Sequence, residues 1–277
     1  MDKKLVGTLI TTFLFCFLFR GISYGAGIAR PIGLGGAFIG VADDVNAVFY
    51  NSAGICFLEE KEFEASIGRT SFDISTGSIA YRQTIDEDSA FGLGLFKSKS
   101  ENNDNLSGFL SYSRKFIEFL SFGVDLKSTA TQITEPDKKT GQSTGLDVNF
   151  LYNAVPEFSI GIKISNLLST DIEYDDDTST RVSSTLKGGA AGRWLDGKVL
   201  WAIDISNGGS MAVYSAGVEG KALDWLTLRG GITGGTGGEE RTLTFGAGFN
   251  YSSMVIDIVH EAGGSWSGQE ASIGLVF

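Results

Sequence analysis

The residues of this sequence that could do chemistry are few and poorly placed for catalysis. His260 is the only histidine in 277 residues, and it alternates with Ile256 and Ile258 on the apolar face of an expected strand. A general base must face a nucleophile or a water, whereas a histidine on this face points away from the interior. Neither a GxSxG nor an HExxH motif occurs. The sequence therefore predicts that the protein is not an enzyme.

Three further groups of residues could hold an ion or a ligand. Asp43 and Asp44 could act as paired carboxylates, but aspartates before a short helical stretch more often accept backbone N–H bonds as caps. The acidic loop at 171–177 could offer oxygen ligands to calcium, yet it lacks the spacing of an EF-hand and is typical of a solvated loop. The glycine-rich run at 230–240 precedes no helix that could cradle phosphate. We expect no metal site and no cofactor.

The N-terminal residues are typical of a secretory signal peptide. A basic start, an apolar run at 5–19 and small residues before position 26 predict a signal peptide at 1–25, cleaved after Gly25. The run is short for a membrane helix, which needs about 20 apolar residues, and a retained anchor is the alternative. Mature protein would keep Cys56 as its one cysteine, so no internal disulfide can stabilise it.

The C-terminal residues, QEASIGLVF, alternate apolar and small or polar side chains up to Phe277. A final strand that ends on an aromatic residue resembles the signal by which outer-membrane barrels are recognised for assembly. We therefore expect Phe277 to engage the barrel-assembly machinery. The expected location is the cell outer membrane, with its lipid and lipopolysaccharide as partners.

Beyond residue 62 the sequence alternates with the period of a strand, and no window keeps a helical period. One face of each segment is apolar and the other is polar or small, with lengths that suit tilted membrane strands. Odd-numbered connections between the expected strands are longer than even-numbered ones, as is typical of outer-membrane barrels. A secreted β-sandwich, the alternative fold, does not require this alternation. The expected strands are 63–70, 78–83, 89–97, 106–116, 120–131, 145–153, 158–166, 183–194, 198–206, 211–221, 225–234, 241–251, 253–261 and 269–277.

The charged residues exclude one class of partner and predict the character of the barrel interior. The net charge is −11, and removal of residues 1–25 leaves 19 basic and 32 acidic residues, so no basic surface exists for nucleic acid. Inward positions of the expected strands carry both signs, which predicts a paired polar network and disfavours an open ion-selective porin. These positions are Asp125, Lys127, Asp147, Lys163, Lys187, Arg193, Asp204, Glu219, Arg229 and Asp257.

Residues 26–62 break the rhythm of strands. They contain glycine-rich turns and a short helical stretch after Asp44, and Asn51 is expected to bond its own turn. The segment is apolar enough to be buried, and the lumen of a fourteen-stranded barrel is too wide for strand side chains alone to fill. We therefore expect an all-β, antiparallel transmembrane barrel at 63–277, with 26–62 as an N-terminal plug, or hatch.

The run GGAFIGVADDVNAVFYNSAG, from Gly35 to Gly54, resembles the N-terminal signature of the FadL-type fatty-acid transporters and the related PorV/PorQ proteins. That family has a Gly-Gly-Ala-Phe, an Ala-Asp-Asp and an Asn-Pro-Ala-Gly stretch in this order before a fourteen-stranded barrel; here Ser52 replaces the proline. The resemblance implies a hatch in the lumen. In the FadL branch it implies a route for hydrophobic molecules through the wall, and in the PorV branch a role in type IX secretion.

The hypothesis that follows is passage of hydrophobic small molecules across the outer membrane. The alternative is a secretion-associated or structural barrel of the PorV/PorQ kind. A transporter needs an apolar pocket beside the plug. The residues expected to form the plug and line such a pocket are Phe38, Asp43, Asp44, Phe49, Tyr50, Asn51 and Phe57.

Overall fold

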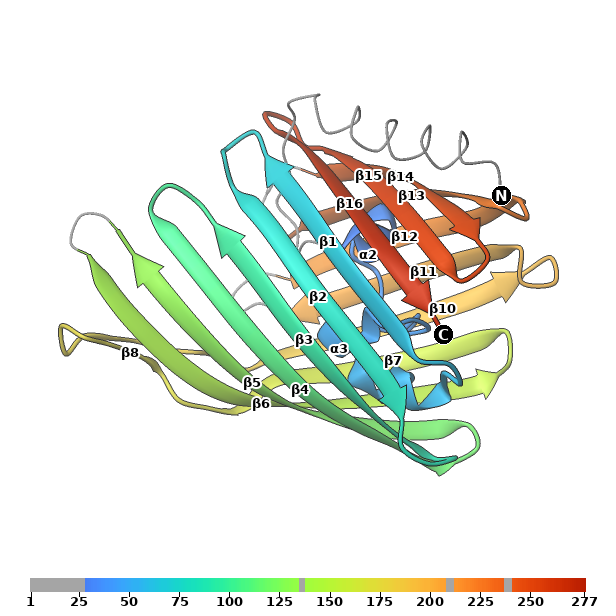
Figure 1. Cartoon of the computed structure of the whole chain (residues 1–277), viewed down its shortest axis with the longest axis horizontal. Helices are drawn as coiled ribbons and strands as arrows, with labels where there is room; N and C mark the ends of the chain where they lie inside the picture. The colour runs from blue at the N-terminus through green and yellow to red at the C-terminus, as the bar shows by residue number, and fades with distance from the viewer. Residues whose placement is uncertain (1–27, 135–137, 208–211, 237–240) are drawn as a thin grey trace.

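The protein is a closed antiparallel β-barrel (Figure 1). The computed structural model describes residues 28–134, 138–207, 212–236 and 241–277, so the signal peptide expected at 1–25 lies outside the described residues. The ring closes because β1 (Glu62–Thr70) pairs with β16 (Ser267–Val276) in antiparallel register over the full length of β1. The expected all-β barrel of fourteen strands is therefore confirmed.

Every expected strand is present, with ends that differ from the expected ones by a few residues. Between β1 and β16 the ring contains β2 (Ser75–Thr84), β3 (Ser89–Lys99), β4 (Asn103–Ile117), β5 (Leu120–Ile133), β6 (Lys139–Val155), β7 (Phe158–Ser169), β10 (Thr185–Trp194), β11 (Val199–Asn207), β12 (Ala212–Leu223), β13 (Leu226–Gly235), β14 (Thr242–Tyr251) and β15 (Met254–Ala262). Strands β4 to β6 are the longest, with 15, 14 and 17 residues. They extend one side of the barrel beyond the rest.

The connections at one end of the barrel are on the whole shorter than those at the other, as expected, although 71–74 and 85–88 are equal in length. At the end of the barrel where β1 starts, the turns at 118–119, 156–157, 224–225 and 252–253 are short. The long connection at the other end, between β7 and β10, contains two small strands that the sequence did not indicate, β8 (Ile172–Tyr174) and β9 (Ser179–Thr180). β8 pairs with β6 and β9 pairs with β8, which continues the tall side of the barrel.

The outer face of the barrel is apolar and the inner face is polar or small. On β11, for example, Ile203 and Ile205 are 53% and 60% exposed, whereas the alternate Ala202 is 1% exposed. Soluble proteins bury their apolar faces, and the reverse arrangement is typical of membrane barrels. Within the described residues no helix is long and apolar enough to cross a membrane.

The described residues before β1 run through the interior of the ring (Figure 1). They form the helices α2 (Ala29–Gly33) and α3 (Ala47–Tyr50) and the 3-10 helix η1 (Ser52–Phe57). We call residues 28–61 the N-terminal segment. Its buried side chains form three apolar clusters with inward-facing strand residues. Inward glycines make this possible: a Cβ on Gly161 would overlap the carbonyl oxygen of Ile39, and one on Gly231 would overlap the backbone at Gly35.

Candidate functional site

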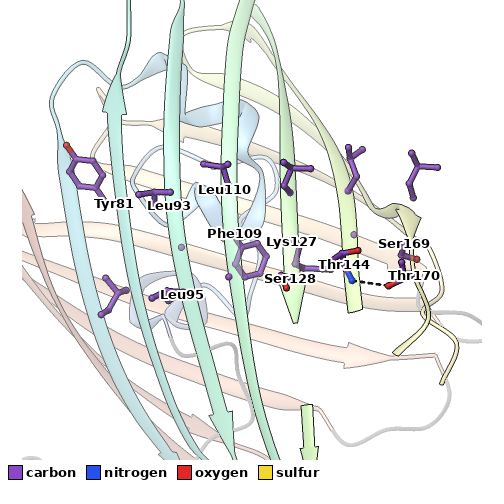
Figure 2. A pocket seen from close by; sticks show the side chains of 17 residues that line it. Tyr81, Leu93, Leu95, Phe109, Leu110, Lys127, Ser128, Thr144, Ser169 and Thr170 are labelled. Atoms are coloured by element: carbon purple, nitrogen blue, oxygen red, sulfur yellow. Dashed lines mark hydrogen bonds between the residues drawn. The ribbon is translucent and has the colours of Figure 1, made fainter. Parts of the chain in front are cut away.

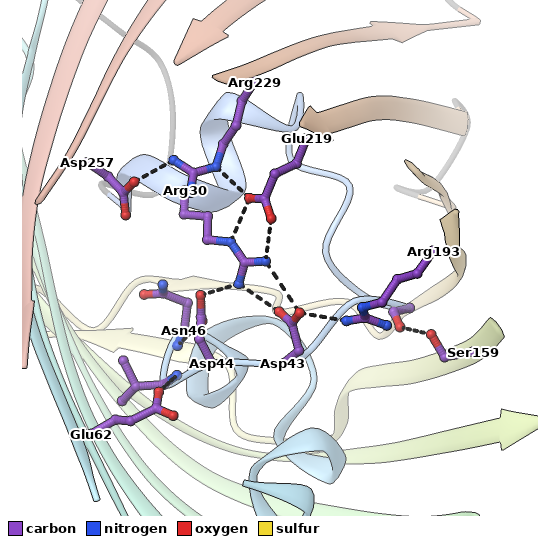
Figure 3. A network of polar contacts seen from close by, with 12 residues as sticks. Arg30, Asp43, Asp44, Asn46, Glu62, Ser159, Arg193, Glu219, Arg229 and Asp257 are labelled. Carbon is purple, nitrogen blue, oxygen red and sulfur yellow. Dashed lines mark hydrogen bonds and ion pairs between the residues drawn. The ribbon is translucent and has the colours of Figure 1, made fainter. Parts of the chain in front are cut away.

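Arg30 of α2 connects two parts of the N-terminal segment and attaches the segment to the barrel wall. Its Nη1 donates to Asp43 Oδ1 and to Asp44 Oδ2, both at 2.6 Å, and its Nε donates to Glu219 Oε2 of β12 at 2.9 Å. The Arg30 side chain is only 13% exposed. Figure 3 shows the guanidinium between the three carboxylates. A planar guanidinium presents several donors at once, which is why one arginine can hold all three.

The wall extends this ion network on both sides of Arg30. Arg229 of β13 donates from Nε to Glu219 at 2.6 Å, and its Nη1 bonds Asp257 of β15. On the other side Arg193 of β10 donates to Asp43 Oδ2 at 2.6 Å. The Arg30 network, comprising Arg30, Asp43, Asp44, Arg193, Glu219, Arg229 and Asp257, thus ties the N-terminal segment to four strands (Figure 3).

The two aspartates of the segment have different environments. Burial opposes ionisation of Asp43, but the guanidinium groups of Arg30 and Arg193 outweigh it and lower the pKa of this carboxyl. For Asp44, burial dominates and the pKa is raised, although Arg30 acts against it. Asp44 Oδ1 also accepts the Asn46 N–H at 2.8 Å. Asp44 therefore accepts a backbone N–H ahead of the helix, as expected, although the N-cap position of α3 is Asn46, which makes no side-chain cap bond. The oxygens of Asp43 are bound by arginines instead.

A second ionic cluster lies on the opposite wall. Lys163 of β7 contacts Asp125 of β5 at 3.2 Å and Asp147 of β6 at 3.1 Å, and Asn149 donates to the same Asp125. All three charged side chains are nearly fully buried. Because buried charges are stable only when paired, the two clusters together bear out the paired polar interior expected from the sequence.

Backbone atoms of the segment are also held by the wall. Asp204 Oδ2 of β11 accepts the N–H groups of Phe38 and Ile39 at 2.8 and 2.9 Å. Asn51 bonds its own turn through Ala53 N–H, as expected, and its amide donates to the carbonyl oxygens of Ile39 and Phe150. These bonds satisfy irregular backbone that is shielded from water.

The structure places the four expected pocket aromatics in two separate groups. Phe38 and Tyr50 meet edge to face at 5.5 Å, within the cluster that packs against β10 and β11. Phe49 meets Phe109 of β4 at 5.3 Å, and Phe57 packs with the cluster beside β3 and β4. No single pocket is shared by all four among the described side chains.

A cavity of about 1070 Å³ lies instead on the wall of β2 to β7 (Figure 2). Its apolar lining comes largely from two rows of outward-facing side chains, with Leu93, Leu110 and Leu126 in one row and Leu95 in the other. Small residues, Gly108 and Ser128 among them, leave the space between the rows. We call this cavity the wall groove.

The wall is thin where the groove approaches the N-terminal segment. Gly94 of β3 and Phe109 of β4 are direct partners across the two strands, and both line the groove. On the inner side a Cβ at Gly94 would lie 2.7 Å from the Phe49 ring. The ring of Phe49 thus lies directly behind a backbone position that carries no side chain. The backbone pairing of β3 with β4, which is continuous from Ser89 to Lys99, separates the interior from the groove.

The other residues weighed from the sequence lie away from these contacts. His260 is exposed on the outer face, as expected. In the acidic loop, Asp175 accepts Thr140 N–H and Asp176 contacts Lys139. Over 28–134, 138–207, 212–236 and 241–277, no three His, Cys, Asp or Glu side chains are grouped to hold a metal ion.

Solved structures match the fold of this protein, whereas comparisons of its sequence find no match. No family model and no curated protein matches the sequence. The toluene transporter TodX of Pseudomonas putida aligns with a TM-score of 0.69 at 15% identity, over 93% of this chain and 99% of that chain. The monoaromatic hydrocarbon channel CymD aligns with a TM-score of 0.70 at 12% identity, over 92% of this chain and 98% of that chain. A FadL homologue of Pseudomonas aeruginosa aligns with a TM-score of 0.63 at 11% identity, over 93% of this chain and 99% of that chain.

At sequence identities of 11% to 15%, these structural matches show a shared fold alone. The resemblance to FadL-type proteins that the Gly35–Gly54 run suggested is confirmed at that level, and these matches leave the PorV/PorQ branch untested. Of these proteins, CymD is named as a channel and TodX as a transporter.

Proposed function

We propose that this protein is an outer-membrane channel for hydrophobic small molecules and has no enzymatic activity. The observation that carries the proposal is the contact between Phe49 and Phe109, which brings the interior segment to a thin wall beside an apolar groove. The fold likeness to a monoaromatic hydrocarbon channel and to toluene transporters supports the same substrate class. The apolar outer face of the barrel suits a lipid environment.

In this proposal residues 26–62 are the plug, and the barrel is 63–277. The Arg30 network and the bonds from Asp204 hold the plug to β10–β15, whereas its contacts with β3 and β4 are largely apolar. A polar solute entering from one end would meet a filled lumen. A hydrophobic molecule can replace the aromatic contact at Phe49 with contacts of its own at little cost.

The route leads sideways through the wall. The molecule passes the Phe49–Phe109 contact and leaves between β3 and β4 beside Gly94, which adds no side chain, into the wall groove in contact with lipid. Because β3 and β4 are paired continuously from Ser89 to Lys99, this step requires local opening of their pairing. Apolar substrates are stable in the hydrocarbon layer, so release there avoids transfer through water or the polar lipopolysaccharide surface. Phe277, which is exposed at the end of the barrel where β1 starts, serves recognition by the assembly machinery.

Equilibrium binding of a fluorescent long-chain fatty acid, with toluene as competitor, tests the proposal on refolded residues 26–277. We expect saturable binding that is weakened by Phe49→Ala and by Phe109→Ala. Phe116→Ala is the matched control, because Phe116 is a 60% exposed aromatic residue on the outer face of the same strand. Removal of residues 26–62 should also change the binding.

Two outcomes would contradict the proposal. Binding no stronger than to empty detergent micelles would exclude a hydrophobic-ligand site and favour the secretion-associated alternative, which cross-linking to partner proteins would then test. Equal losses in the Phe109 and Phe116 variants would place the ligand on the outer surface and remove the route past Phe49.

A further inference from the structure

A buried arginine on β2 has no carboxylate bonded to it. Arg82 is 0% exposed, and its Nε and Nη1 have no hydrogen-bond partner among the described residues. Its remaining nitrogen, Nη2, donates to the carbonyl oxygen of Ile55 at 3.0 Å, to that of Leu58 and to the Thr84 hydroxyl at 3.2 Å. A guanidinium removed from water is stable only when a carboxylate or several acceptors surround it. Two unsatisfied nitrogens therefore leave Arg82 incompletely paired.

The residue opposite Arg82 on β1 is an acid. Glu62 and Arg82 are register partners, and such partners project from the same face of a sheet with Cβ atoms about 5 Å apart, which is close enough for an ion pair. In the structure Glu62 turns to the N-terminal segment instead, where its Oε2 accepts the Val45 N–H at 2.7 Å (Figure 3). Opposite charges thus lie on neighbouring positions of the wall, and each is bonded to the segment.

The surrounding strands offer neither residue an equally placed partner. Arg82 is the only lysine or arginine at an inward position of β16, β1, β2 or β3 within the described residues. Glu64, the next inward acid on β1, lies opposite Ala80 and accepts a bond from the Asn46 amide at 3.2 Å. The sheet register therefore sets Glu62 beside Arg82.

These two side chains hold the part of the segment that contains Phe49. Glu62 binds the segment before α3, and Arg82 binds it beyond α3, within η1 and at the residue that caps it. Phe49 lies in α3, between the two attachments. Both attachments end on backbone atoms, so a displacement of α3 from the wall removes them together.

We propose that Glu62 and Arg82 form an ion pair with each other when residues 45–58 leave the wall, and that this pair stabilises the open plug. The inference rests on the proposed function, in which a ligand displaces Phe49. While the segment is in place, both charges bind its backbone. Once it leaves, rotation of two neighbouring side chains brings the charges together, which offsets part of the cost of opening. The plug is then an element with two arrangements that differ little in free energy.

A double-mutant cycle tests the proposal without any ligand. The full protein is isolated from outer membranes as wild type, Glu62→Gln, Arg82→Gln and the double variant, and heat-dependent gel mobility checks that each barrel is folded. Hydrogen exchange of the amides of 45–57 measures the open population. Either glutamine alone abolishes the pair, so the second change removes nothing further from the open state. We expect the double variant to exchange about fivefold faster than the product of the single effects, which corresponds to about 1 kcal/mol.

Two comparisons isolate the pair. Asp204 also accepts backbone N–H groups of the segment, but it belongs to β11, on the opposite side of the ring from β2. The effects of Asp204→Asn and Arg82→Gln should therefore multiply. Arg82→Lys retains the positive charge and hence the pair, so Glu62→Gln should change exchange by the same factor in Arg82→Lys as in the wild type.

Salt dependence gives a measurement that needs only the isosteric Glu62→Gln variant. The pair of the open state lies in a lumen that water has entered, where added salt screens it. Added sodium chloride should therefore slow the exchange of 45–57 in the wild type relative to Glu62→Gln.

Three results would overturn the inference. They are single effects that simply multiply in the double glutamine variant, a double variant that exchanges more slowly than their product, which would place the attraction in the closed state, and equal salt responses of the wild type and Glu62→Gln. Because no ligand is present, these results are distinct from a failure of the binding test of the proposed function.

Discussion

Replacement of Arg30 by methionine should release the N-terminal segment while the barrel stays closed. Methionine keeps the length of the side chain and removes its charge and donors. Removing one member of a buried ion pair costs about 3–5 kcal/mol, and Arg30 and its three partners are 11% to 29% exposed. Asp43 keeps Arg193 and Glu219 keeps Arg229, so only Asp44 loses its one cation, and we expect the lower end, about 3 kcal/mol.

That loss corresponds to an increase on the order of a hundredfold in the population of the released segment. Hydrogen exchange with mass spectrometry measures it through the amides of 34–57, which should exchange faster by that factor, while the strand amides of β1–β7 keep their rates. Arg69→Met is the control, because its ion pair with Asp73 is 65% and 77% exposed and such pairs contribute about 1 kcal/mol or less. Unchanged exchange of 34–57 in Arg30→Met would refute the assignment of Arg30 as the main attachment, and equal acceleration in the strands would show that it stabilises the barrel instead.

Three further predictions concern the plug, the second ionic cluster and the route. Gly231→Val should displace residues 34–35 from the wall, since even a Cβ there overlaps their backbone, and limited proteolysis should then cut the N-terminal segment. Gly220→Val, where nothing lies within 4 Å, should leave the segment resistant to the protease. Resistance of the segment in both variants would contradict the packing. Lys163→Met should lower the temperature of the heat-induced mobility change on gels. It leaves Asp125 buried without a cation and Asp147 with Lys127 alone at 3.8 Å, so we expect the lower end of the cost of breaking a buried pair, about 3 kcal/mol. Lys97→Met, whose side chain is half exposed, should leave this temperature unchanged, and equal temperatures in the two variants would argue against the cluster. Gly94→Leu should displace the Phe49 ring, since even a Cβ there lies 2.7 Å from it, and should itself occupy the path and slow ligand release. The same gel assay checks that the barrel still folds, and release at the original rate would exclude this path.

The barrel could be predicted from the sequence because its signal is local. Strands such as β7 and β11 alternate apolar and polar residues with period two, which needs no knowledge of the rest of the chain. The extended ends of β4 to β6, and strands β8 and β9, escaped prediction because they lie beyond the apolar band, where both faces are polar and the alternation fades.

The site was harder to predict because its contacts join distant parts of the sequence. Arg30 and Glu219 are 189 residues apart, and a lone arginine in a glycine-rich stretch gives no sign of its partners. The aromatic residues Phe49 and Phe57 were expected in the segment, but the wall groove depends on the pairing of β3 with β4, which sets Gly94 opposite Phe109 and Leu95 opposite Gly108. Sequence spacing does not show this pairing.

The most direct test of the channel function is the initial rate of uptake of radiolabelled toluene by cells whose outer membrane contains the protein. We predict faster uptake than in cells without it, a return towards the basal rate for Gly94→Leu at equal protein abundance, and no increase in uptake of a small sugar. Toluene uptake that does not depend on the protein, or a parallel increase in sugar uptake, would contradict a plugged channel for hydrophobic molecules.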